Sequence, residues 1–180
     1  MLVRAALVPD TALLVPGTAG AAPVLAEVRA AALDAVREVV ASEARTIVVV
    51  APGRAPRELA GTVRPTLGAA GIPDRLLGWP VRDAVLPGSG AGQASVAGAV
   101  ALHLLVRAGR TDGLRVVEVT GAQGADELAA LGRSLVSDGP TGMVVVGSGS
   151  GRHGPDAPLA DDPRAVDHDA RVLADLADAV

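Results

Sequence analysis

The chain has 180 residues, which suits one domain with one core, so we expect a single domain over 1–180. All 16 basic residues are arginines, and with 20 acidic residues the formal charge is −4. The chain has no basic tract that could bind the phosphates of nucleic acid, so we expect no nucleic-acid partner. The absence of cysteine excludes disulfides and thiolate sites. No apolar run reaches the roughly 18 residues of a membrane helix, and the N-terminal run is too short for a signal peptide, so we expect a cytoplasmic protein without a membrane partner.

The first half of the chain predicts two strands around a long helix. Residues 2–8 form a short apolar run, which predicts a buried first strand. Apolar residues recur at helical spacing over 22–43, which predicts an amphipathic helix. Residues 46–51 are apolar on both faces, as in a central parallel strand covered by helices on both sides. The segment 54–80 is rich in proline and glycine, so we expect short or irregular elements there, with Trp79 packed beneath them.

The second half alternates strands and helices. Apolar runs and helical periodicity predict strands at 81–86, 114–120 and 142–147, and helices at 93–108, 125–137 and 163–179. This alternation is typical of an α/β fold in which helices cover both faces of the sheet. We therefore predict a three-layer α/β/α domain with a largely parallel or mixed central sheet.

Two glycine-rich segments have the composition of phosphate-binding loops. Residues 149–154 match the spacing of the dinucleotide fingerprint, but Pro155 and Pro158 prevent a helix from starting there, which favours a flexible loop at the mouth of a site. Residues 87–92 join a predicted strand to a predicted helix without a Walker lysine. A close-packed turn is the simpler interpretation of that segment.

Serine and histidine residues near the end of the chain are the candidates for catalysis. Gly149 occupies the central position of 147–151, so this segment does not match the nucleophile elbow of serine hydrolases. Ser150 with His168 remains a conceivable pair. His103 lies in an apolar helical segment, where packing is the usual explanation.

Metal binding is a second possibility for the same region. His153 and His168 flank several carboxylates, which together have the composition of a two-histidine, one-carboxylate site. A solvated acidic loop and helix start is the alternative interpretation. These carboxylates are Asp156, Asp161, Asp162, Asp167 and Asp169.

Several segments, in matching order, resemble one enzyme family along nearly the whole chain. They are Ala6-Leu-Val-Pro-Asp-Thr-Ala-Leu-Leu-Val-Pro16, Ile47-Val-Val-Val-Ala-Pro-Gly53, Val144-Val-Val-Gly-Ser-Gly-Ser150, Ala157-Pro158, Asp162-Pro163-Arg164 and Asp169. The family is the catalytic subunit of class III extradiol ring-cleavage dioxygenases, of the protocatechuate 4,5-dioxygenase β-subunit type. This resemblance implies the α/β fold predicted above and an ancestral activity that opens aromatic rings with Fe(II).

The residues that the resemblance assigns to iron binding are replaced here. Asp10 stands where the family has its first histidine ligand, and 52–54 stands where the second follows its strand. Gly151 and Ser148 stand at the histidine and aspartate of the motif that supplies the catalytic base. The family's C-terminal glutamate ligand has no clear counterpart, so the resemblance implies a divergent member with a degenerate metal site.

We therefore expect a non-catalytic or repurposed extradiol-dioxygenase-like protein that binds a small molecule or a protein partner in the ancestral cleft, without a cofactor. The polar residues expected at that cleft are Asp10, Arg54, Ser148, Ser150, Arg152 and His153.

The alternative is a metal-dependent oxidoreductase or dioxygenase that uses Fe(II) or zinc at a relocated site built from Asp10, His153 and His168. If the protein is an enzyme, its catalytic candidates are Asp10, Ser150 and His153. Apolar residues of the last helix, together with the family's habit of pairing subunits, predict a homo-oligomer, most simply a dimer.

Overall fold

A computed structural model describes residues 1–155, 157 and 159–178. The chain divides into two compact units, Met1–Gly147 and Ser148–Val180, which are described separately. The expectation of a single domain over 1–180 stays a prediction. Asp156 and Pro158, named above, and the predicted end of the last helix at Ala179 lie outside the described residues.

The first unit contains two sheets, three α-helices and three 3-10 helices. Its strands are β1 (Leu2–Val8), β2 (Thr46–Pro52), β3 (Arg57–Leu59), β4 (Gly61–Arg64), β5 (Ala84–Leu86), β6 (Ala91–Gln93), β7 (Leu114–Val119) and β8 (Thr141–Val146). Its α-helices are α1 (Ala26–Ala41), α2 (Val96–Arg107) and α3 (Ala125–Leu135), and its 3-10 helices are Ala12–Leu14, Gly68–Ala70 and Asp74–Leu76. The second unit contains α4 (Arg164–Asp178).

The main sheet has five strands in the order β1-β8-β2-β7-β3. The first four are mutually parallel, and β3 is antiparallel to β7 at the edge. The prediction of a central strand at 46–51 is confirmed, because β2 is the middle strand and both Val48 and Val49 are fully buried. The carboxyl ends of β2 and β7 consequently lie next to each other at one edge of the sheet.

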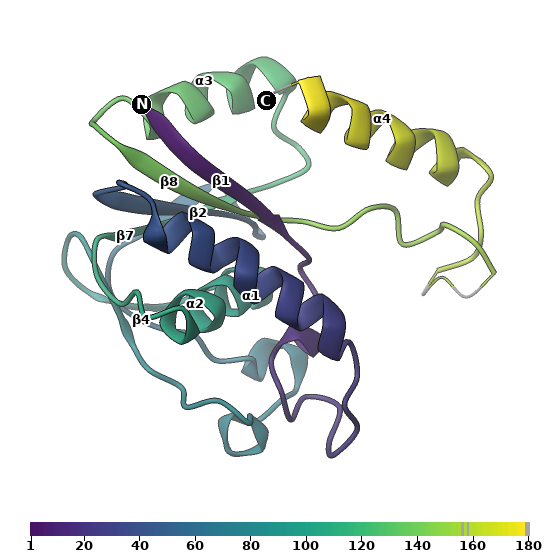
Figure 1. The fold of residues 1–180 in the computed structure, drawn as a ribbon, viewed down its shortest axis with the longest axis horizontal. Helices are drawn as coiled ribbons and strands as arrows, with labels where there is room; N and C mark the ends of the chain where they lie inside the picture. Colours follow the sequence, from purple (N-terminus) through teal and green to yellow (C-terminus); the bar gives the residue numbers. More distant parts are fainter. Residues whose placement is uncertain (156, 158, 179–180) are drawn as a thin grey trace. The chain divides into compact units, whose positions relative to one another are not determined.

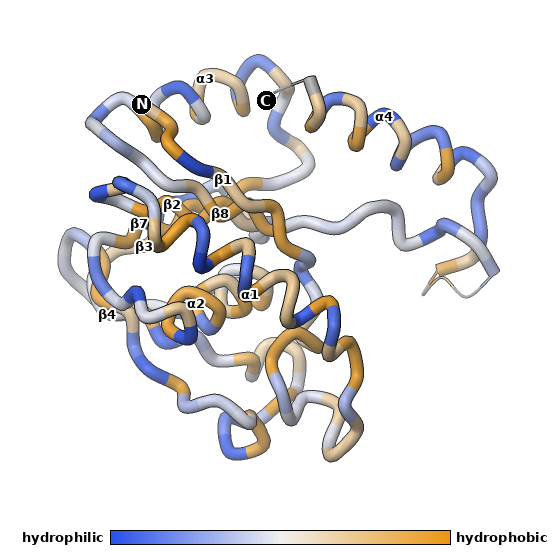
Figure 2. The backbone as a smooth tube through the Cα atoms, in the orientation of Figure 1, coloured by the Kyte–Doolittle hydropathy of each residue, from blue (hydrophilic) through white to orange (hydrophobic). Residues whose placement is uncertain are grey.

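Helices cover both faces of this sheet, with α1 and α2 on one face and α3 on the other (Figure 1). Alternate side chains of β2 point to opposite faces of the sheet. Ile47 and Val49 belong to the core with α1 and α2, whereas Val48 packs with Leu131 and Leu135 of α3. Figure 2 shows the hydrophobic residues gathered along the strands and α2. The three-layer α/β arrangement is therefore as predicted.

The first strand is less buried than expected. It forms the edge of the main sheet, and Leu2 and Leu7 are exposed, while Ala6 and Val8 face the core. A short apolar run does not reveal how many neighbouring strands it will have, so the prediction of a buried strand at 2–8 was wrong.

A second small sheet, in the order β5-β4-β6, was not predicted. Its three- and four-residue strands lie partly in the 54–80 segment expected to be irregular, and β6 delays the start of the helix predicted at 93 to Val96. Strands this short form because of their partners rather than their own propensity. Trp79 packs against the core beside this region, as predicted.

The helix of the second unit, α4, is amphipathic, with hydrophilic and hydrophobic residues alternating along it (Figure 2). Val172, Leu173 and Leu176 are exposed on it. Self-association through this helix stays a prediction. In the described part of the chain, every helix falls short of the length and apolar character needed to cross a bilayer.

Candidate functional site

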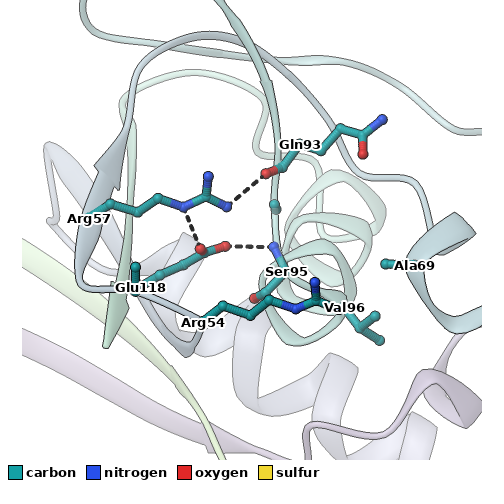
Figure 3. A pocket seen from close by; sticks show the side chains of 9 residues that line it. Arg54, Arg57, Ala69, Gln93, Ser95, Val96 and Glu118 are labelled. Atoms are coloured by element: carbon teal, nitrogen blue, oxygen red, sulfur yellow. Dashed lines mark hydrogen bonds and ion pairs between the residues drawn. The ribbon is translucent and has the colours of Figure 1, made fainter. Parts of the chain in front are cut away.

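A pocket of about 600 Å³ lies where β2 and β7 end, beside the first turn of α2. Its polar wall consists of Arg54, Arg57, Gln93, Ser95 and Glu118 (Figure 3). Ligands of α/β proteins commonly bind outside the carboxyl ends of the strands, where loops diverge. We therefore take this pocket as the candidate site of the first unit.

Glu118 is the buried centre of the pocket, with only 1% of the residue exposed. Its Oε1 accepts a hydrogen bond from the Ser95 backbone N–H at 2.5 Å, and its Oε2 accepts one from Arg57 Nε at 2.7 Å. Arg57 and Glu118 are directly paired residues of antiparallel strands, so their side chains project to the same face. Burying a carboxylate is costly unless it is paired and hydrogen-bonded, and these two contacts provide both.

The backbone around Glu118 is shaped to receive its side chain. A Cβ on Gly53, directly after β2, would lie 2.7 Å from the Glu118 Cβ and 2.9 Å from its Oε2. Only glycine therefore fits there without moving the carboxylate. On the other side, Ser95 is the N-cap of α2, and its Oγ accepts a hydrogen bond from the Gly98 N–H at 3.1 Å.

The other groups of the pocket are positive or hydrogen-bond donors. Arg57 is held in place by a second bond, from Nη2 to the Gln93 carbonyl at 3.1 Å. Arg54 is exposed, and within the described chain no hydrogen bond or ion pair holds its guanidinium. The first turn of α2 adds the N–H group of Val96, which has no partner within the helix. Two guanidinium groups and a helix N-terminus against one carboxylate favour an anionic ligand.

The second unit contains a separate polar cluster around Asp169. Its Oδ1 accepts a hydrogen bond from the Ser150 backbone N–H at 2.7 Å, and its Oδ2 lies 2.9 Å from His153 Nδ1. Gly149 allows this approach, since a Cβ there would lie 3.0 Å from Oδ1. The bond from Ser150, followed by that from His153, lowers the pKa of the Asp169 carboxyl below its usual value. An aspartate bonded to His153 Nδ1 orients the ring so that its Nε2 can serve as a base or a metal ligand.

The six residues expected at one cleft belong to both units. Arg54 lines the pocket of the first unit, and Asp10 follows β1 in the same unit but is not among the residues described as lining that pocket. The remaining four belong to the second unit: Ser148, Ser150, Arg152 and His153. Two of these, Ser150 and Arg152, border a hollow of about 250 Å³ together with His168.

The pairing of Ser150 with His168, considered above as conceivable, is not among the hydrogen bonds of the described residues. The Ser150 hydroxyl instead accepts a bond from the Arg152 N–H at 3.2 Å, and the histidine that contacts Asp169 is His153. The hydroxyl is therefore engaged by its own loop, in a turn typical of serine.

A relocated metal site built from Asp10, His153 and His168 stays a hypothesis, because the aspartate belongs to one unit and the histidines to the other. Over residues 1–155, 157 and 159–178, no group of three or more histidine, aspartate or glutamate side chains is arranged to hold a metal ion.

Glu118, Arg57 and Ser95 were not predicted from the sequence. The available signal was a lone glutamate in the otherwise apolar end of the strand at 114–120, because a glutamate is almost never fully buried unless it is paired. Its partner Arg57 is 61 residues away, and no local pattern identifies it.

Comparisons with known proteins provide no template for either cluster. No protein-family model matches the sequence, and no curated protein or solved structure matches it. What the pocket binds is therefore inferred from the side chains that line it.

Replacing Gly53 with alanine tests the tight packing around the buried carboxylate. We expect Gly53→Ala to lower the free energy of unfolding by about 1–3 kcal/mol, because the new methyl group displaces Glu118 from its partners. Urea unfolding followed by circular dichroism measures the change. The matched control is Gly92→Ala, whose Cβ would meet nothing within 4 Å and which should cause no loss. Equal unfolding midpoints for both variants would contradict this packing.

The lowered pKa of Asp169 predicts a pH dependence of the second unit. Because its folded pKa lies below the unfolded value of about 3.9, its hydrogen bonds contribute stability above pH 4, and this is lost as the pH falls through the folded pKa. We expect the Ser150 amide proton shift in NMR spectra to titrate with a midpoint below 3.9. Asp169→Asn should remove that titration, and a midpoint above 4 would contradict the contact.

Proposed function

We propose that the protein binds a small organic carboxylate in the pocket formed by Arg54, Arg57 and the first turn of α2, and that it does so without catalysing a reaction. The observation that supports this most directly is the fixed Arg57, whose Nε is bonded to the buried Glu118 and whose Nη2 is bonded to the Gln93 carbonyl. A guanidinium held in place by the protein loses little further freedom on binding. Its remaining N–H groups are then available to a ligand.

The chemistry of the pocket favours a carboxylate over a neutral molecule. A guanidinium presents a planar fork of donors that matches the two oxygens of a carboxylate. Arg54 provides a second guanidinium from the loop after β2. The volume of about 600 Å³ lies in the usual range for small-molecule sites, so a ring-sized acid fits better than a single ion.

The family resemblance is part of this proposal. The dioxygenase-like motifs place the ancestral cleft at the ends of the first two strands of the sequence, and Arg54 lies in the segment that follows the second of them. A scaffold that has exchanged iron ligands for an aspartate and an arginine retains the hollow but not the ring-opening reaction. The proposed protein is thus a repurposed binding module, and a carboxylate side chain of a protein partner is a further possible occupant.

Titration calorimetry with benzoate and its neutral isostere benzamide tests the proposal. We expect benzoate to bind and benzamide to bind at least tenfold more weakly, a difference of about 1.4 kcal/mol. Arg54→Ala should weaken benzoate binding by a similar factor. The control Arg133→Ala removes the same charge from an exposed position on α3 and should have no effect. Equal binding of both compounds, or no effect of Arg54→Ala, would overturn the proposal.

A second candidate function, a metal-dependent enzyme, is favoured by the contact between His153 and Asp169. Carboxylates commonly hold metal-binding histidines by the other ring nitrogen, as Asp169 holds His153 Nδ1. The purified protein should then contain near-stoichiometric iron or zinc by elemental analysis, and His153→Ala should remove it. Metal-free wild-type protein, after expression with both metals supplied, would eliminate this candidate.

A further inference from the structure

The hollow of about 250 Å³ in the second unit lies between the loop that follows β8 and helix α4. The loop contributes Ser150 and Arg152 to its wall. Helix α4 contributes Arg164, His168 and Arg171, which are spaced four and three residues apart. Side chains at this spacing lie on one face of a helix. Cationic and polar side chains therefore border the hollow from both the loop and the helix.

Hydrogen bonds join these two walls to each other. Asp169 of α4 accepts a bond from the Ser150 N–H at 2.7 Å. The N–H of Asp162, just before α4, donates to the Arg152 carbonyl at 3.0 Å. The loop and the helix are thus connected next to the residues that line the hollow. Walls that are already in place lose little freedom when a ligand binds.

Arg152 and Arg171 bring positive charge to the hollow, and in the described part of the chain no carboxylate pairs with either of them. Each is held by a backbone carbonyl instead. Arg152 Nη1 donates to the Ala160 carbonyl at 3.2 Å, and Arg171 Nε donates to the Asp167 carbonyl at 3.2 Å. A carbonyl holds a guanidinium in place without neutralising it. Most of the five N–H donors of each group therefore remain available to a ligand.

The carboxylates of the second unit do not cancel these two charges. Among the described residues that line the hollow, Asp162 is the one carboxylate, and Arg164 pairs with both of its oxygens, with Nη2 at 2.6 Å from Oδ2 and Nε at 2.9 Å from Oδ1. Asp161 and Asp169 accept bonds from N–H groups of the loop and are not among the residues described as lining the hollow. The unmatched charge is that of two guanidinium groups, which favours a dianion.

The geometry of the donors favours a phosphate group over a carboxylate. A planar carboxylate matches the fork of a single guanidinium. The three terminal oxygens of a phosphate group can meet donors from the loop and from the helix together. Ser150 adds to these donors, because its oxygen accepts a bond from the Arg152 N–H and its own proton is left for a ligand oxygen.

The size of the hollow favours an ester over the free ion. With about 30 Å³ of liquid per water molecule, the hollow holds about eight non-hydrogen atoms, compared with about five in a phosphate ion. We propose that this hollow binds the dianionic phosphate group of a small phosphate monoester, through Arg152, Arg171 and Ser150. The site belongs to the second unit, whereas the carboxylate pocket belongs to the first.

Calorimetric titration of the full chain at pH 7.5 and constant ionic strength tests this proposal. A phosphate monoester is mainly a dianion there, since its second pKa is about 6. We expect methyl phosphate to bind at least tenfold more tightly than dimethyl phosphate, which carries one charge, and than malonate, a dianion of two planar carboxylates. Methyl phosphate should also bind at least as tightly as inorganic phosphate. In NMR spectra it should move the backbone N–H signals of Ser150 and Arg152 and leave those of 54–57 in place.

Matched variants assign the binding to the two arginines. Arg152→Gln and Arg171→Gln should each weaken methyl phosphate binding tenfold or more. Both residues are exposed, so the variants should fold, which circular dichroism checks. The control Arg133→Gln removes the same charge from an exposed position on α3 and should have no effect. Arg54→Ala should also leave methyl phosphate binding unchanged, so the result does not depend on the carboxylate pocket.

Several results would overturn the proposal. Dimethyl phosphate that binds as tightly as methyl phosphate would show that the second charge is not recognised. Malonate or inorganic phosphate that binds more tightly than methyl phosphate would show that the hollow is not built for an ester. Signal changes confined to 54–57 would place the ester in the first unit. No binding of methyl phosphate up to about 10 mM, a concentration that detects millimolar affinities, would eliminate the site.

Discussion

The buried carboxylate of Glu118 is the interaction on which the arrangement of the first unit depends. It connects three elements that are distant in the sequence: β7 carries the glutamate, β3 contributes Arg57, and the first residues of α2 contribute the Ser95 amide. Removing Arg57 leaves the buried carboxylate with the Ser95 N–H as its remaining hydrogen-bond donor, and removing Glu118 leaves that N–H without its acceptor, which is more costly than never having made the contact. The carboxylate therefore fixes where the edge strand β3 and the start of α2 lie relative to the parallel sheet.

Stability alone is a weak reason for such a pair. Buried ion pairs can often be replaced by apolar residues of similar volume at little or no cost. What an apolar replacement would not reproduce is the fixed orientation of Arg57, which is half exposed at the mouth of the pocket while Glu118 is hidden behind it. The pair is best understood as a support that fixes the Arg57 guanidinium at the pocket, which is the feature on which the proposed function depends.

Helix α2 carries the first turn of the pocket on an apolar body. Its residues from Ala97 to Leu105 are buried, and among them His103 is the only one with an ionisable side chain. A helix surrounded by core cannot shift without disturbing packing on every side, since interiors are close-packed. Its polar N-terminal turn is thus held at a fixed position, as a binding site requires.

The layers of the fold were predictable from the sequence because they depend on local patterns. The run 46–51 is apolar on both faces, which only a covered strand needs, and the helices follow from their periodicity. The edge position of β1 and the pairing of three-residue strands such as β6 depend on the order of strands in space, which no local pattern encodes. The elements that the sequence did not reveal, such as the small sheet, are therefore those that form only when strands distant in the sequence pair with one another.

The candidate site was predictable only in part, for the same reason. Arg54 was expected at a cleft because it follows a strand, and the structure places it in a pocket. Asp10 also follows a strand, but β8 lies between β1 and β2, which separates the two strand ends by roughly 10 Å at the usual strand spacing. The contact of Asp169 with His153 rather than His168 depends on how the loop 149–154 turns, and spacing alone does not determine that.

If the dioxygenase resemblance holds, the segment after β2 carries Arg54 where that family has a histidine ligand, and the two side chains hold different kinds of ligand. An imidazole offers a lone pair to a metal ion, whereas a guanidinium has five donors, no acceptor, and a charge that it does not lose in proteins. On the proposed descent from a dioxygenase scaffold, Arg54 therefore reverses the preference of the cleft from a cation to an anion.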